Sequence, residues 1–166
     1  MSTSIQNQNV IVSRFSAAFH ASGRVVAMVS VRQQGIMVFI DDLGSDRFRV
    51  DVECIVEPSH QSLADHRVTS LAGWVACELA HSMSDGVSCH ERDLLVHFVP
   101  PAWSPIQPSV YDWTRTASIE HIDQALQISC MLVRQRWRYV MRLAGELMHR
   151  DSLGWRDIQA VMEPSP

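Results

Sequence analysis

Three long segments of this 166-residue chain place apolar side chains at helical spacing, and they surround one region that alternates like a β-hairpin. The helical segments are expected at residues 14–29, 61–82 and 118–147. The last of them is expected as one long helix or as two helices with a break near Arg134. The hairpin is expected from residues 36–40 and 48–54, joined by a turn-rich stretch at 41–46, and a short helix follows over 154–162. This order predicts an α+β fold that is predominantly helical and contains a small β-hairpin.

The first helical segment carries an interrupted metal-binding motif. In an H-E-x-x-H helix two histidines one turn apart bind zinc, and the glutamate beside the first activates water. Residues 20–24 read His20-Ala21-Ser22-Gly23-Arg24, so Ala21 replaces the glutamate and Arg24 replaces the second histidine. Arginine has no lone pair for a metal, and alanine cannot act as a base. We expect Arg24 on the same helix face as His20, roughly 5–6 Å away, on the accessible flank of the apolar stripe.

Composition excludes several classes of function. All 14 basic residues are arginines, so a phosphate-binding P-loop and lysine Schiff-base chemistry are excluded, and no ATP binding is expected. The net charge of −4 argues against a nucleic-acid partner. The first ten residues lack the order of a signal peptide, and no apolar run reaches the length of a membrane span. A cytoplasmic protein with no membrane association is therefore expected, with its four scattered cysteines as free thiols.

The chain is expected to form one domain over residues 13–162. Residues 1–12 are expected to be a flexible N-terminal arm, and residues 163–166 a loose tail. Residues 83–117 are rich in proline and are expected to be extended, with a short strand at 94–99.

The order of motifs along the chain resembles the peptidase domain of the FtsH-type AAA zinc metalloproteases. Residues 18–26 match the family's metal-binding helix apart from the substitutions above, and Leu71-Ala72-Gly73 opens a stretch similar to its L-A-G-R-x-A-E-E-L helix. Further matches lie at residues 124–133, 137–147 and 153–158. The resemblance implies a zincin-like fold, present here as a degenerate, stand-alone domain without the ATPase module.

The resemblance also implies the position of a vestigial site. Aligning Ala125 with the family's alanine places His121 where the family has its third ligand, an aspartate, with Glu120 and Asp123 close by. The vestigial site would then comprise His20, Arg24, Glu120, His121 and Asp123, with Ala21 at the position of the general base. We expect Arg24 to pair with Glu120 or Asp123. This set implies no catalysis and no cofactor, and the chain is expected to be a pseudo-peptidase that binds or regulates a protein partner.

Two alternatives stay open. The first is a zinc metallopeptidase with the non-standard ligands His20, His121 and a carboxylate from Asp123 or Glu120, for which Glu78 is a candidate base. The second is a small interaction domain with a structural zinc site made of Cys77, His81, Cys89 and His90. Tryptophans are frequent anchors of protein interfaces, and the candidates for that role are Trp74, Trp103, Trp113 and Trp155.

Overall fold

The computed structural model describes residues 10–54, 63–84 and 119–163. Within these ranges the protein is α+β and predominantly helical, as the sequence predicts. The elements in chain order are β1 (Val10–Val12), α1 (Arg14–Ser30), β2 (Ile36–Asp42), β3 (Arg47–Cys54), α2 (Leu63–Ser84), α5 (Ile119–Gln135), α6 (Trp137–Leu147), β4 (Ser152–Leu153) and α7 (Trp155–Met162).

The predicted hairpin is present, but it forms part of a larger sheet. Strands β2 and β3 pair antiparallel, with Val38 opposite Val52 and Ile40 opposite Val50. Two very short strands extend the pair to a four-stranded antiparallel sheet in the order β1-β3-β2-β4. The hairpin is therefore confirmed, but β1 and β4 were not predicted, and the last three residues of the expected flexible arm form β1. Strands of two or three residues are too short to show an alternating pattern in the sequence.

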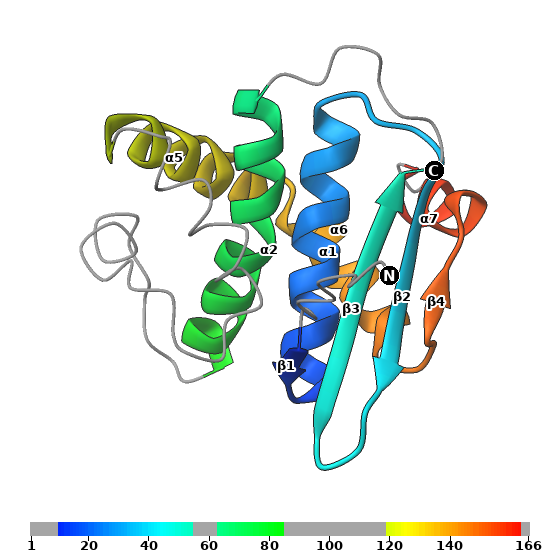
Figure 1. Ribbon diagram of the computed structural model, residues 1–166. Coiled ribbons are helices and arrows are strands. Elements are labelled where there is room, and N and C mark those ends of the chain that lie inside the picture. Colours follow the sequence, from blue (N-terminus) through cyan, green and yellow to red (C-terminus); the bar gives the residue numbers. More distant parts are fainter. Residues whose placement is uncertain (1–9, 55–62, 85–118, 164–166) are drawn as a thin grey trace, which may run out of the picture.

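Helix α1 occupies the centre of the fold, between α2 and the sheet (Figure 1). It also contacts α6, so it is covered on most of its circumference. Twelve of its residues are buried, and these include the polar residues Ser16, His20 and Ser22. The helix begins where predicted, because the Ser13 hydroxyl accepts a hydrogen bond from the backbone N–H of Ser16 at 3.2 Å, as an N-cap does. A helix covered in this way buries side chains that would be accessible on a surface helix.

Small residues let α1 and α2 approach closely. A Cβ atom added to Gly23 of α1 would lie 2.4 Å from the carbonyl oxygen of Ala72 and 2.5 Å from the Cβ of Ala76, both in α2. The backbones therefore touch at a point where only hydrogen fits. The sequence predicts a thin second helix from Ala72, Gly73 and Ala76, and the close packing of α1 on α2 confirms it.

The long helical region breaks into two helices, which is the second of the two expected forms. Helix α5 ends at Gln135, and Arg136, with φ −112° and ψ 20°, precedes the first residue of α6. The second predicted helix is present as Leu63–Ser84, and the last as Trp155–Met162. The extended segment expected at residues 83–117, with its strand at 94–99, lies almost entirely outside the described residues.

Arg14 connects the start of α1 to the chain that follows α6. Its Nε donates to the Leu147 carbonyl at 2.8 Å, an Nη donates to the Arg150 carbonyl, and the other Nη pairs with the Asp151 carboxylate at 2.8 Å. We expect Arg14→Ala to lower the free energy of unfolding by about 1–3 kcal/mol, because it removes charge-assisted bonds to the Leu147 carbonyl at the end of α6 and to the Arg150 carbonyl beyond it. Urea unfolding followed by circular dichroism measures this change.

The matched control is Asp151→Ala, which removes only the ion pair. The Asp151 side chain is 83% exposed, so this variant is expected to cost less than about 1 kcal/mol. An equal loss in the two variants would contradict the role assigned to the two carbonyl contacts.

Candidate functional site

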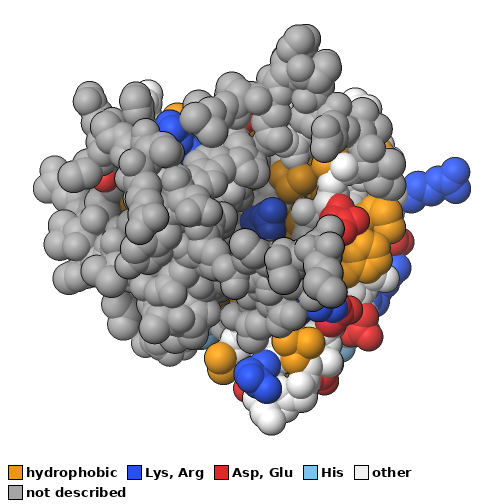
Figure 2. All heavy atoms as spheres, viewed as in Figure 1, with side chains coloured by type: hydrophobic (Ala, Val, Ile, Leu, Met, Phe, Trp, Pro, Cys, Tyr) orange, Lys and Arg blue, Asp and Glu red, His pale blue; other side chains and the backbone are white. Residues whose placement is uncertain are grey.

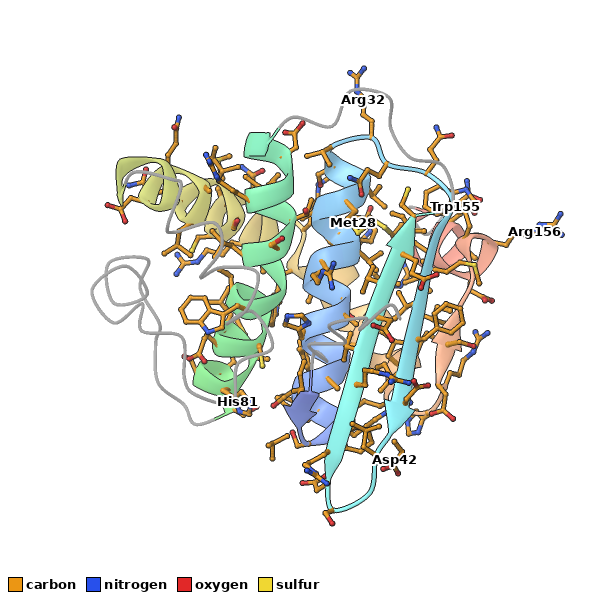
Figure 3. The ribbon with its side chains drawn as sticks, in the orientation of Figure 1. Met28, Arg32, Asp42, His81, Trp155 and Arg156 are labelled. Atoms are coloured by element: carbon orange, nitrogen blue, oxygen red, sulfur yellow. The ribbon has the colours of Figure 1, made fainter. Side chains whose placement is uncertain are left out.

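The predicted site residues of α1 lie on the face that packs against α2. The two helices run antiparallel, so Gly23 meets Ala72 in the middle of α2, while Ser16 meets His81 near its end. Figure 3 shows His81 at that end of α2, next to the start of α1. His20 lies between these two contacts, Arg24 directly follows Gly23, and the two side chains meet over Gly73.

Gly73 makes room for both side chains. A Cβ atom on Gly73 would lie 2.7 Å from the Cγ of Arg24 and 2.9 Å from the Nε2 of His20. The spacing of His20 and Arg24 predicts that they share a helix face, and their common contact with Gly73 confirms it. The role of Gly73 itself could not be predicted, because it depends on how α2 is placed against α1.

His20 is buried, with 4% of its surface exposed. The expectation that it lies on an accessible flank of α1 is therefore wrong, because α2 covers it. Its Nδ1 and Nε2 atoms are both buried and have no hydrogen-bond partner among the described residues. Burial and, to a lesser extent, the positive charge of Arg24 together lower the pKa of His20 to about 3. The ring is therefore neutral at physiological pH, with one nitrogen able to donate and the other able to accept.

Arg24 is partly buried, and its Nε has no hydrogen-bond partner among the described residues. Burial lowers the pKa of its guanidinium, and the negative charge of Asp51 on β3 acts in the opposite direction. Asp51 also lies 3.5 Å from Arg49, and its side chain is 43% exposed, so it compensates Arg24 only in part. Sequence reasoning missed Asp51, because its sheet position bears no fixed spacing to α1.

The other predicted members of the vestigial site belong to α5. Glu120 and His121 are in its first turn, and their side chains are not among those the structure describes. Asp123 is exposed, and no ion pair joins it to Arg24 in the described part of the chain. The expectation that Arg24 pairs with Glu120 or Asp123 therefore stays a prediction that now depends on Glu120. Among the described residues no three His, Cys, Asp or Glu side chains are grouped so that they could hold a metal ion.

A second polar cluster lies at the other end of the same helix pair. The Ser16 hydroxyl is 2.8 Å from the Nε2 of His81 and 3.1 Å from the Ser13 hydroxyl. Ser16 is 3% exposed, so a substrate does not reach this hydroxyl in the present arrangement. The cluster therefore links the N-terminal turn of α1 to α2. Sequence analysis did not predict this cluster, because it depends on how α2 is placed against α1.

Two members of the predicted structural zinc site are in this region. The Cys77 thiol points to the carbonyl oxygen of Ser16 at 3.8 Å, and burial raises the pKa of this thiol to about 12. Zinc is bound by the thiolate form of cysteine, so a raised thiol pKa disfavours Cys77 as a zinc ligand. Cys89 and His90 lie outside the described residues.

Glu78 was the candidate base for the metallopeptidase alternative. Burial raises the pKa of its carboxyl group, and the nearby His81 acts in the opposite direction. The histidine that acts on the Glu78 carboxyl group is thus His81, near the C-terminal end of α2, and not His20. Among the candidate anchors, Trp74 is buried and Trp155 is partly buried, while Trp103 and Trp113 lie outside the described residues.

Comparisons with known proteins give no assignment. No protein-family model matches the chain, and no curated protein matches it either. No helix in the described part of the chain is long and apolar enough to cross a membrane.

Proposed function

We propose that this chain is a catalytically inactive, zincin-like domain of the FtsH peptidase type that serves as a cytoplasmic binding or regulatory module for a protein partner. The observation that carries the proposal is the position of Arg24 beside His20. The two side chains meet over Gly73, where a metal-binding helix would need its second histidine.

The charge of Arg24 opposes a dication at this place. At an effective dielectric constant near 20, a unit charge and a dication about 6 Å apart repel each other by roughly 5 kcal/mol. The positive charge of Arg24 also contributes to the lowered pKa of His20, which shows that this charge disfavours a second positive charge at the imidazole ring. Ala21 is fully buried and supplies only a methyl group at the position of the general base.

Exposed methionines support a role in protein binding. Among the described residues the exposed large apolar side chains are Val12, Leu43, Met83, Met131, Met141 and Met148. Four of these six are methionines, whose flexible side chains adapt to different partners. Exposed methionines of this kind are side chains that a partner protein could contact.

Metal content tests the proposal. We expect purified protein to contain well under one equivalent of zinc by elemental mass spectrometry, and to show no zinc-dependent cleavage of an unfolded protein such as casein. His20→Ala should leave both results unchanged. His149→Ala is the matched control, because His149 is an exposed histidine outside the site.

Two results would contradict the proposal in different ways. One equivalent of zinc that is lost in His20→Ala but kept in His149→Ala would favour the metallopeptidase with His20 and His121. Zinc that survives His20→Ala and is lost in Cys77→Ser would favour the structural zinc site instead.

A further inference from the structure

Several buried polar atoms at the point where α1 crosses α2 have no hydrogen-bond partner among the described residues. The two ring nitrogens of His20 and the Nε of Arg24 are buried, and none has a partner among the described residues. A buried polar group without a partner costs free energy that a hydrogen bond would recover. These three unpartnered atoms belong to two neighbouring side chains that meet over Gly73.

Arg24 differs from the arginines that support the fold. Arg14, Arg49 and Arg150 each form an ion pair with a carboxylate, whereas no ion pair of Arg24 is found in the described part of the chain. Packing holds the side chain, because its Cγ sits against Gly73 and its Nε is buried. A guanidinium that is held in place and partly shielded from water forms stronger hydrogen bonds to an anion than a mobile surface arginine does.

Arg24 is also accessible from outside. The residue is only partly buried, and it lies on the helix next to β3, whose Asp51 is the carboxylate that acts on it. Figure 2 shows side chains of both charge signs reaching the surface on the face where α1 lies beside β3. The exposed part of Arg24 is therefore the part that a ligand would contact, while its buried side stays packed against α2.

The balance of charge selects the class of anion. The site has one permanent positive charge, the neighbouring His20 stays neutral, and Asp51 supplies partial negative charge. A singly charged group matches this balance, whereas a phosphate dianion would leave negative charge uncompensated. The planar guanidinium fits the two oxygens of a carboxylate, which it binds with two parallel hydrogen bonds.

We propose that Arg24, seated over Gly73 beside His20, forms a carboxylate-binding site that takes a carboxylate of a peptide partner. The proposal rests on the function proposed above, since it names the chemistry by which the vestigial site recognises its partner. The carboxylate can come from a glutamate or aspartate side chain or from the C-terminus of the peptide. Both sources present the same two oxygens to the guanidinium.

Three N-acetylated tripeptides test the proposal and separate the two sources. The first is alanine–glutamate–alanine with an amidated C-terminus, and the second is alanine–glutamine–alanine with a free C-terminus. The third, alanine–glutamine–alanine with an amidated C-terminus, has no carboxylate. Each is titrated into the ¹⁵N-labelled 166-residue protein, and the Nε–Hε signal of Arg24 is followed by NMR. We expect a saturable shift with at least one carboxylate peptide and none with the third.

A pair of variants checks that the shift reports binding at Arg24. Arg24→Gln should raise the dissociation constant of the carboxylate peptide that binds by about tenfold or more, because it removes a charge-assisted pair of hydrogen bonds. Arg156→Gln removes an exposed arginine that points away from the fold, and it should leave the constant unchanged (Figure 3). Thermal unfolding of each variant confirms that it is folded.

Some outcomes overturn this inference without touching the proposed function. These are an unmoved Arg24 signal with both carboxylate peptides, an equal shift with the uncharged peptide, and equal weakening in the two variants. The wild-type titration alone decides the first two, so they do not depend on the folding of a variant. By contrast, zinc that is lost in His20→Ala would overturn the proposed function whatever the peptides do.

Discussion

Gly23→Ala is expected to destabilise the protein, although alanine is the better helix former. The new methyl group would lie 2.4 Å from the carbonyl oxygen of Ala72, and that atom belongs to a helix backbone that cannot rotate away. The two helices must move apart, which loosens every contact along their crossing. Overpacking of this kind costs about 1–3 kcal/mol or more, against a gain of about 1 kcal/mol in helix propensity. We expect a net loss of about 2 kcal/mol for Gly23→Ala and a larger loss for Gly23→Val, measured by urea unfolding.

Gly145→Ala is the matched control for this prediction. Gly145 is also in the interior of a helix, but it is exposed, and no atom lies within 4 Å of an added Cβ. The same chemical change should therefore raise the free energy of unfolding by about 0.5–1 kcal/mol. Opposite signs at the two glycines are the expected result. If Gly23→Ala were as stabilising as Gly145→Ala, the close approach of α1 and α2 would be contradicted.

The stability of the protein is expected to fall in mild acid because of His20. Folding lowers the pKa of this residue from 6.5 to about 3, so below pH 6.5 the unfolded chain takes up a proton that the folded chain does not. Protons then favour the unfolded state, and the free energy of unfolding falls by about 1.4 kcal/mol per pH unit as the pH decreases from 6.5 towards 3. At pH 4.5 the expected loss from His20 is about 3 kcal/mol, and above pH 6.5 there is none.

His20→Leu isolates this contribution from that of the acidic residues. The free energy of unfolding is measured at pH 7.5 and at pH 4.5 for both proteins, and the difference between the two pH values should shrink by about 3 kcal/mol in the variant. At pH 7.5 the variant should itself be about 1–2 kcal/mol more stable, since it removes two buried nitrogens without partners. His149→Leu should leave the pH dependence unchanged. An unaltered pH dependence in His20→Leu would show that His20 has a partner or contact with water in solution.

Much of the fold follows from local patterns in the sequence. The spacing of Phe15, Phe19 and Val26 predicts α1 almost to its ends, and the alternation over residues 48–54 predicts β3. The neighbourhood of His20 and Arg24 follows from helix geometry alone. These features were predictable because each depends on residues a few positions apart, where helical and strand periodicities apply directly.

Position 21 carries no base and position 24 cannot ligate a metal in any fold, because these limits are properties of alanine and arginine themselves. By contrast, contacts between distant elements make His20 buried and neutral, bring Asp51 near Arg24 and place Ser16 against His81. The same is true of β1 and β4, which exist as strands only through their pairing with β3 and β2. The physical reason is common to all of them. Burial, charge compensation and strand pairing are set by atoms brought together from distant parts of the chain, and a local pattern contains no information about which neighbours will cover it.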